Sequence, residues 1–216
     1  MLRPSNSSKI ISHYFPEIDS SKLKKFNQLI DLYKNWNSQI NVISRKDLDN
    51  FYIRHVLHSL AIAKYITFKK NSSILDVGTG GGFPGIPLAI YFNNVNFTLI
   101  DSIGKKIKVV QEVSKSLDLE NVRSFHSRAE DINDKFDFIV SRAVTHFSKF
   151  CPWVSANVKN ENNHEIKNGI IYLKGGDLKD EINSISKNYW HNKKNISDFF
   201  DEDFFETKSI VYLSKK

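Results

Sequence analysis

The sequence predicts an α/β fold in which a doubly wound, mainly parallel sheet follows an N-terminal helical extension. Three observations predict it. From residue 71 onward, short apolar runs alternate with amphipathic stretches, as in parallel strands joined by helices. A glycine-rich turn separates the first of these runs from the first helical stretch. Before that unit, apolar residues recur every three or four positions within 19–38, as on one face of a helix.

Two helices are predicted before residue 71, one over 19–38 and a second from about 47 to 66. Leu23, Phe26 and Leu29 share one face of the first helix, and Asp19 is suited to cap its amino end. Strands are predicted at 73–77, 96–101, 122–126, 136–141, 169–174 and 208–213. Helices are predicted at 86–92, 103–117, 146–158 and 177–187, and loops at 160–168 and 193–203. We expect a single structural unit with two parts, a basic helical extension (1–70) packed on the core and an α/β domain (71–216).

Composition and charge narrow the class of protein. The 216 residues include one cysteine, so an intrachain disulfide is excluded, and they contain no apolar run long enough to span a membrane. We therefore expect a cytoplasmic protein without a membrane partner, and a monomer. The net charge is +7, and residues 1–70 carry 12 Lys and Arg against five Asp and Glu. This basic excess fits either a solvated lysine-rich surface or an attachment that faces a polyanion.

The run ILDVGTGGGFPG, residues 74–85, predicts the binding site. Asp76 ends an apolar strand, and the turn that follows contains Gly78, Gly80 and Gly82 before Phe83. Glycines allow positive φ and a close approach of a ligand to the backbone. A strand, a glycine loop and a helix in this order place a ligand at the carboxyl edge of a parallel sheet. Asp101 ends the next strand, where a carboxylate can accept hydrogen bonds from ribose hydroxyls. The two strand ends together indicate a nucleoside cofactor.

The position of Asp76 favours one nucleoside cofactor over another. In a dinucleotide site, a helix N-terminus faces a pyrophosphate. The carboxylate of Asp76, which precedes the first glycine, would repel that group. It could instead pair with the ammonium of a methionine moiety, directly or through water. The sequence therefore favours S-adenosyl-L-methionine, and a nicotinamide-dependent oxidoreductase is the less favoured alternative.

Polar side chains also follow the other predicted strands. Ser102 comes directly after Asp101, and Ala129 and Glu130 follow the third strand. Glu130 or the neighbouring backbone could bind the edge of an adenine, because that base is recognised only through its amine and ring nitrogens.

Two cations follow later strands of the predicted sheet. Arg142 directly follows the fourth strand and Lys174 ends the fifth. They could contact the carboxylate of the cofactor or a substrate phosphate. Alternatively, they could form ion pairs with Asp76, Asp101 or Glu130.

The residues that a catalytic thiol, a metal site or an amine methylase would need are absent from the sequence or poorly placed in it. Cys151 falls inside the predicted helix 146–158, so we expect a buried structural thiol. His55 and His58 lie i, i+3 on a helix without a third ligand cluster, so we expect structural or substrate-facing roles and no metal. His126 and His146 are expected at the edge of the core. The sequence also lacks the N/D-P-P-Y/F run that orients an amine nitrogen for methylation.

The chain resembles the bacterial small-subunit rRNA guanine-N7 methyltransferases, the glucose-inhibited division protein B family. Its D-V-G-T-G-x-G-x-P-G-I-P run, followed by L-x-D-S-x-x-K-K, is specific for that family. The residues that carry the likeness are 36–37, 41–44, 54–57, 76–85, 101–106, 127–130, 141–143 and 173–175.

The resemblance implies a class I S-adenosylmethionine-dependent methyltransferase fold. It implies methyl transfer to N7 of one guanine in 16S rRNA of the small ribosomal subunit. It also implies that the cofactor contacts Gly78, Phe83, Ala129, Glu130 and Arg142, with Asp101 near the ribose, and that Lys174 and Arg142 lie near the substrate.

The chain departs from the family pattern at two places. His58 stands where an acidic residue is usual, and Thr207 and Lys208 follow Glu206 where a Glu-Arg pair is usual. These departures concern contacts with RNA rather than the cofactor site.

The absence of a familiar set of catalytic residues from the sequence agrees with the implied reaction. N7 of guanine has an exposed lone pair, so its methylation needs no general base and depends on in-line positioning. Two alternatives stay open at this point: a methyltransferase that acts on a small molecule or a protein, and a non-catalytic RNA-binding assembly factor.

Overall fold

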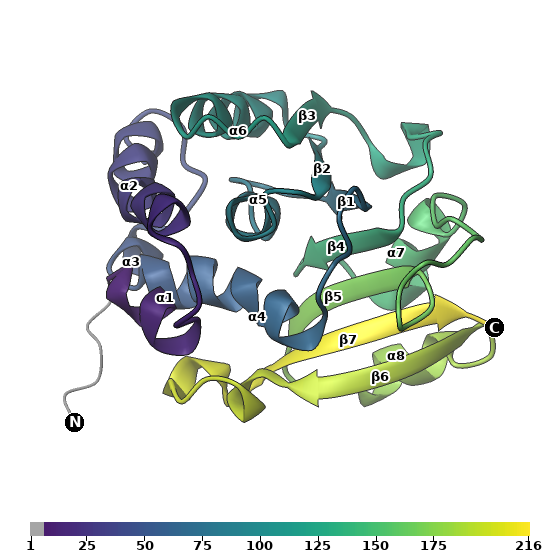
Figure 1. Ribbon diagram of the computed structural model, residues 1–216. Helices are drawn as coiled ribbons and strands as arrows, with labels where there is room; N and C mark the ends of the chain where they lie inside the picture. Colours follow the sequence, from purple (N-terminus) through teal and green to yellow (C-terminus); the bar gives the residue numbers. More distant parts are fainter. Residues whose placement is uncertain (1–6) are drawn as a thin grey trace.

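The structure, a computed structural model, describes residues 7–216 and forms a three-layer α/β/α sandwich around one seven-stranded sheet (Figure 1). Five strands are parallel. The last two strands of the chain form a hairpin that extends one edge of the sheet, and in it β7 runs antiparallel to its neighbours β5 and β6. In their order across the sheet, the strands are β3 (Val122–His126), β2 (Asn96–Asp101), β1 (Ser73–Val77), β4 (Phe138–Arg142), β5 (Gly169–Gly175), β7 (Lys208–Lys215) and β6 (Tyr189–Asn195).

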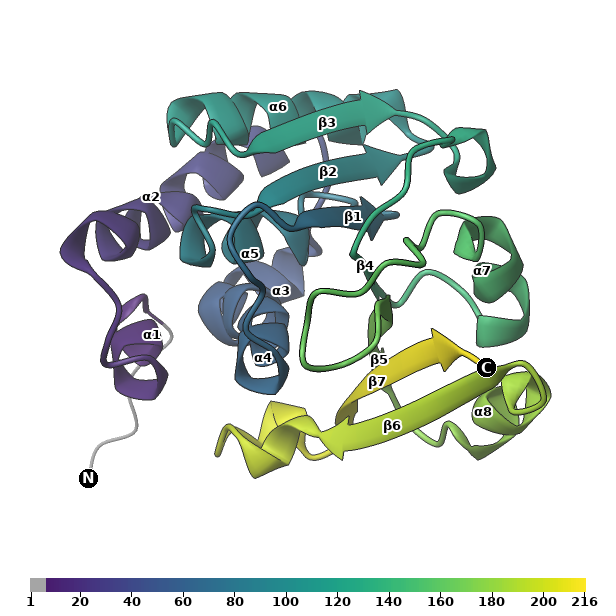
Figure 2. The ribbon, with the colours of Figure 1, turned by 45° about the vertical axis from the view of Figure 1, so that its right-hand side comes forward.

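Helices cover both faces of the sheet (Figures 1 and 2). Side chains alternate between the faces along each strand; in β1, Ile74 joins one apolar cluster while Leu75 and Val77 join the other. The first face carries α1 (Lys9–Tyr14), α2 (Ser20–Asn37), α3 (Arg45–Leu48), the π-helix η1 (Tyr52–Leu57), α4 (His58–Tyr65), α5 (Gly85–Tyr91) and α6 (Gly104–Ser116). The second carries α7 (Phe147–Val154) and α8 (Lys179–Ile185). Three short 3₁₀ segments are η2 (Ala129–Asp131), η3 (Ile196–Asp198) and η4 (Asp203–Phe205).

The predicted fold class is confirmed, and most elements lie where the sequence placed them. The strands at 73–77, 96–101 and 122–126 agree to the residue. Strand β6 was missed, and the loop predicted at 193–203 was wrong for its first three residues. The cause is that β6 pairs only with β7 and that, from Trp190 onward, its side chains are exposed, so it lacks the apolar alternation of a strand. Helix α1 was also not predicted, and the second predicted helix is divided into α3, η1 and α4.

The N-terminal helices share one apolar cluster with the sheet. Phe26, Leu29 and Tyr33 of α2 are fully buried and belong to the same cluster as Phe83 and Ile86 of the βα unit. The division of the chain at residue 70 stays a prediction, and residues 1–6 of the predicted extension lie outside the described residues. Between residues 7 and 216, no helix combines the length and the apolar character that crossing a bilayer requires.

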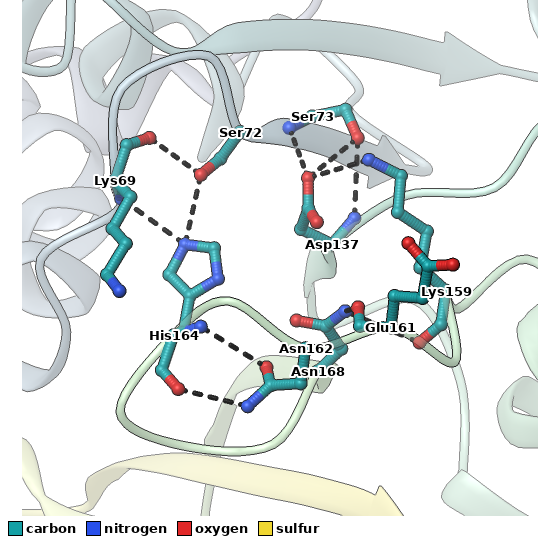
Figure 3. Close-up of polar contacts among 9 residues, drawn as sticks. All are labelled: Lys69, Ser72, Ser73, Asp137, Lys159, Glu161, Asn162, His164 and Asn168. Atoms are coloured by element: carbon teal, nitrogen blue, oxygen red, sulfur yellow. Dashed lines mark hydrogen bonds and ion pairs between the residues drawn. The ribbon is translucent and has the colours of Figure 1, made fainter.

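A polar network ties the loop after α7 to the amino ends of the central strands (Figure 3). The carboxylate of Asp137 accepts hydrogen bonds from the backbone N–H of Ser73 (2.7 Å) and from Lys159 Nζ (2.9 Å). Burial alone would raise the pKa of Asp137, but these bonds hold it below its ordinary value. His164 Nε2 lies 2.9 Å from Ser72 Oγ. Loop 159–168 is therefore held at the edge opposite the carboxyl ends of the parallel strands.

Gly85 lies where the packing of the βα unit leaves no room for a side chain. A Cβ there would lie 2.6 Å from Leu99 Cγ and 2.7 Å from Asp76 Oδ2. We expect Gly85→Ala to lower the free energy of unfolding by about 1–3 kcal/mol, the cost of overpacking a core, as measured by urea denaturation. Gly104→Ala is the matched control, because Gly104 begins α6 and a Cβ would meet only the exposed ring of His126, at 3.2 Å. Equal losses in both variants would contradict this account.

Candidate functional site

The glycine loop joins β1 to α5 at the carboxyl edge of the sheet. Gly78, Gly80 and Gly82 have φ values of +66°, +57° and +97°, a region that L side chains rarely adopt. The backbone N–H of Gly80 donates to Asp101 Oδ2 at 2.9 Å, and the N–H of Ile103 donates to Asp101 Oδ1 at the same distance. Asp101 therefore ties the glycine loop to the end of β2.

A cavity of about 160 Å³ opens beside this loop. Five residues predicted from the sequence line it, namely Gly78, Asp101, Ser102, Ala129 and Glu130. Ser127 and Arg128, from the segment 127–130 that carries the family likeness, also line it, and the structure adds four residues that were not predicted for the site: Val77, Ile100, Val144 and Trp153. Val144 and Trp153 come from the segment after β4 and from α7, so only the packing of the chain brings them to the cavity.

Asp76 lies under the glycine loop and is fully buried. Its Oδ2 accepts hydrogen bonds from Thr79 Oγ1 (2.6 Å) and from the backbone N–H of Gly85 (2.8 Å). Its Oδ1 has no hydrogen-bond partner among the described residues. Burial raises the pKa of Asp76 to about 7, because a low-dielectric environment disfavours the charged form. A buried carboxylate with a free acceptor atom is suited to receive a cationic group of a ligand.

Arg142 lies on the same face of the sheet as Asp76. Asp76 pairs in register with Val140 of β4, so Arg142, two residues further, points to the same side. Its guanidinium donates to the backbone carbonyl of Arg54 (3.2 Å) and to His55 Nδ1 (3.0 Å). Burial lowers the pKa of Arg142 to about 10, against an opposing effect of Asp76.

The bond to Arg142 sets the state of His55. Because a guanidinium only donates, Nδ1 of His55 must be the acceptor and the ring must be neutral. Burial and the nearby Arg142 lower the pKa of His55 to about 3, so the ring stays neutral at physiological pH. His55 and Phe83 pack against each other at 5.1 Å between ring centroids, and the Arg142 guanidinium lies 5.2 Å from the Phe83 ring. The end of β4 is thereby joined to η1 in the N-terminal helical region.

Lys174 lies toward the second face of the sheet and is 9% exposed. Its ammonium forms an ion pair with Glu181 Oε2 of α8 at 2.6 Å and donates to the carbonyl of Thr145 at 2.7 Å. The ion pair expected as an alternative therefore exists, but with Glu181 rather than with Asp76, Asp101 or Glu130. Glu181 could not be predicted as a partner, because α8 reads as an ordinary polar helix in the sequence.

The remaining predicted residues have mainly structural surroundings. Cys151 is buried, as expected, and burial raises the pKa of its thiol to about 12. His58 is buried against Phe204 at 5.5 Å between ring centroids. His126 and His146 are more exposed than the core edge that we expected, because they end β3 and precede α7. Among the described residues, no three His, Cys, Asp or Glu side chains are grouped to hold a metal ion.

The fold is that of the class I S-adenosylmethionine-dependent methyltransferases. A solved structure titled as a SAM-dependent methyltransferase from Aquifex aeolicus superposes with a TM-score of 0.57 at 16% identity, and the match covers 78% of this chain and 95% of that one. At that identity the likeness shows the fold alone.

The family is shown by closer relatives. The family model described as rRNA small subunit methyltransferase G matches residues 22–202. A Christiangramia forsetii protein named Ribosomal RNA small subunit methyltransferase G is 56% identical over 209 residues, which cover 96% of this chain and 97% of the relative. A Cytophaga hutchinsonii protein of the same name is 52% identical, covering 95% and 98%. This chain belongs to the rRNA small subunit methyltransferase G family, and the family predicted from the sequence is confirmed.

Proposed function

We propose that this protein transfers a methyl group from S-adenosyl-L-methionine to N7 of one guanine in 16S rRNA of the small ribosomal subunit. The observation that carries the proposal is the buried carboxylate of Asp76, with a free Oδ1, under a glycine loop beside a cavity. Relatives that are about half identical over nearly the whole chain, and that are named for methylation of small-subunit rRNA, support the substrate class.

The residues at the carboxyl edge fit the three parts of the cofactor. The free Oδ1 of Asp76 would receive the ammonium of the methionine moiety, and the backbone at Gly78 would lie against that moiety. Asp101 would accept hydrogen bonds from the ribose hydroxyls, and Ala129 and Glu130 would contact the adenine. Ser102, Gly80, Gly82 and Phe83 complete the predicted set, because they shape or support the glycine loop and the end of β2.

The protein's contribution to the reaction would be positional. When bound, the cofactor supplies an electrophilic methyl group on a sulfonium. N7 of guanine carries its own lone pair, so the residues around the cavity need only hold the base in line and exclude water. A general base is not needed for that atom, and the Nδ1 of the neutral His55 is already bonded to Arg142. Arg142 would help to orient the substrate. Lys174 would do so indirectly, through its contacts with Glu181 and with the carbonyl of Thr145.

The basic N-terminal region would contact the RNA. Residues 1–70 carry 12 of the 31 Lys and Arg but five of the 24 Asp and Glu. Lysine and arginine bind phosphates without reading sequence, so this region would supply affinity that falls as salt rises. We propose that the protein acts as a monomer in the cytoplasm, where its substrate is assembled.

The experiment that tests the function identifies the methylated atom. The purified protein is incubated with methyl-labelled S-adenosylmethionine and either 16S rRNA or small ribosomal subunits that lack the modification. The RNA is then digested to nucleosides and analysed by mass spectrometry. We expect labelled 7-methylguanosine. Label on another nucleoside would overturn the target atom. Cofactor binding without any labelled RNA would favour a small-molecule or protein substrate, or a non-catalytic assembly role.

A further inference from the structure

The segment 143–146 joins β4 to α7 beside the proposed cofactor cavity. Val144 lines the cavity, and a Cβ added to Gly78 would lie 2.5 Å from Val144 Cγ2. The segment is therefore in close contact with the glycine loop. Ala143 has a φ of +52°, a conformation that costs a non-glycine residue about 1–2 kcal/mol. Surrounding contacts must hold the segment in this shape.

The first of these contacts comes from Tyr172 of β5. Its hydroxyl oxygen accepts hydrogen bonds from the backbone N–H groups of Val144 (2.8 Å) and Thr145 (3.0 Å). The same hydroxyl donates to the carbonyl of Thr145 at 3.2 Å. Tyr172 is fully buried between Phe147 and Phe150 of α7, with ring centroids 5.4 and 4.7 Å away. One rigid side chain thus satisfies three backbone groups of the segment.

The second contact comes from Glu181 of α8. Its Oε2 accepts a hydrogen bond from the backbone N–H of Phe147 (3.2 Å), the first residue of α7. A carboxylate there is favourable, because the amino end of a helix carries partial positive charge. The same oxygen pairs with Lys174, whose ammonium also donates to the carbonyl of Thr145. Glu181 therefore holds both the end of the segment and the cation that binds its middle.

We propose that Tyr172 and Glu181 are positioning residues that fix segment 143–146 against Gly78 for methyl transfer. The inference rests on the function proposed above. Both side chains act from the α7 and α8 face of the sheet, whereas His55 holds the adjoining Arg142 from the other face. The segment that contributes Val144 to the cavity, together with the adjoining Arg142, is therefore held from both faces of the sheet. A displacement of about 1 Å at such a site can cost about 100-fold in rate.

Replacing Tyr172 by phenylalanine tests the first contact. Tyr172→Phe keeps the ring and leaves the N–H groups of Val144 and Thr145 without their acceptor. We expect amide hydrogen exchange in 143–147 to accelerate, and kcat for RNA methylation to fall about tenfold at saturating substrates. Tyr212→Phe is the matched control, because its hydroxyl donates to the carbonyl of Lys167 on the far side of the sheet. We expect that variant to lose similar thermal stability while keeping its kcat and its exchange in 143–147.

Two variants of Glu181 test the second contact. Glu181→Gln keeps an acceptor for the N–H of Phe147 and for Lys174, whereas Glu181→Ala removes it. We expect Gln to retain most of the wild-type kcat and Ala to lose about tenfold. A kcat in Tyr172→Phe equal to that of Tyr212→Phe, with unchanged exchange in 143–147, would overturn the inference. If the wild-type protein labels no RNA, the proposed function fails on its own, and the exchange rates alone still decide whether Tyr172 holds the segment.

Discussion

Gly78→Asp is expected to abolish binding of S-adenosylmethionine, with the dissociation constant rising by about 100-fold or more, since it combines steric and electrostatic effects of several kcal/mol. Gly78 has a φ of +66°, and a Cβ would lie 2.5 Å from Val144 Cγ2, so the side chain would displace the segment that lines the cavity. It would also add a negative charge near Asp76 and Asp101. Isothermal titration of the purified variant measures the effect.

Gly176→Asp is the control for this experiment. Gly176 also has a positive φ, +82°, but a Cβ there meets nothing within 4 Å and the residue does not line the cavity. The control therefore reproduces the backbone strain and the added charge without filling the proposed cradle. We expect it to bind the cofactor as the wild-type protein does. Retained affinity in Gly78→Asp would show that the cofactor binds elsewhere.

Asp76→Asn is expected to weaken cofactor binding while it stabilises the protein without cofactor. Asparagine keeps an oxygen for the bonds from Thr79 and Gly85 but loses the charge that would attract the methionine ammonium. Hydrogen bonds to charged groups contribute about 1.5–3 kcal/mol, so we expect the dissociation constant to rise by about tenfold or more. Titration calorimetry at pH 8, where the wild-type carboxyl is ionised, measures this loss.

The stabilisation should depend on pH in a defined direction. The pKa of Asp76 is raised from 3.8 to about 7 by burial. Between these two values the folded protein holds a proton that the unfolded chain has released, so stability falls as the pH rises. Asparagine does not titrate. The melting temperature of the variant should therefore exceed that of the wild-type protein above pH 7, and the difference should disappear near pH 4.

Asp137→Asn provides a control of opposite sign. Bonds from Ser73 and Lys159 hold the pKa of Asp137 below its ordinary value despite its burial. Removing this charge should lower the melting temperature at pH 7 and leave cofactor affinity unchanged, because Asp137 directly precedes β4 and so lies at the amino ends of the parallel strands. If Asp76→Asn also lowered the melting temperature at pH 8, the ionised Asp76 would have to be satisfied in the protein without cofactor.

The sequence by itself determined the fold class and the family, and it predicts the edge of the sheet at which the cofactor would bind. Four parallel strands, β1, β2, β4 and β5, could be predicted because they are largely buried and read as short apolar runs between breaks. The glycine loop could be predicted because positive φ and close packing restrict those positions to glycine. Asp76 and Asp101 were recognisable because a charged residue directly after a buried strand is unusual. Strand β6 was not recognisable, since its sequence, with exposed side chains from Trp190 onward, follows no apolar pattern.

Only the tertiary structure decided which partners the predicted side chains take. Arg142 binds His55, which is 87 residues away along the chain, and Lys174 binds Glu181 and Thr145. Tyr172 and Val144 became part of the site through the packing of α7 and α8 on the sheet. A hydrogen bond between distant residues depends on distances of about 3 Å. Periodicity and spacing determine which face a side chain lies on, but those distances are set only when the layers pack together.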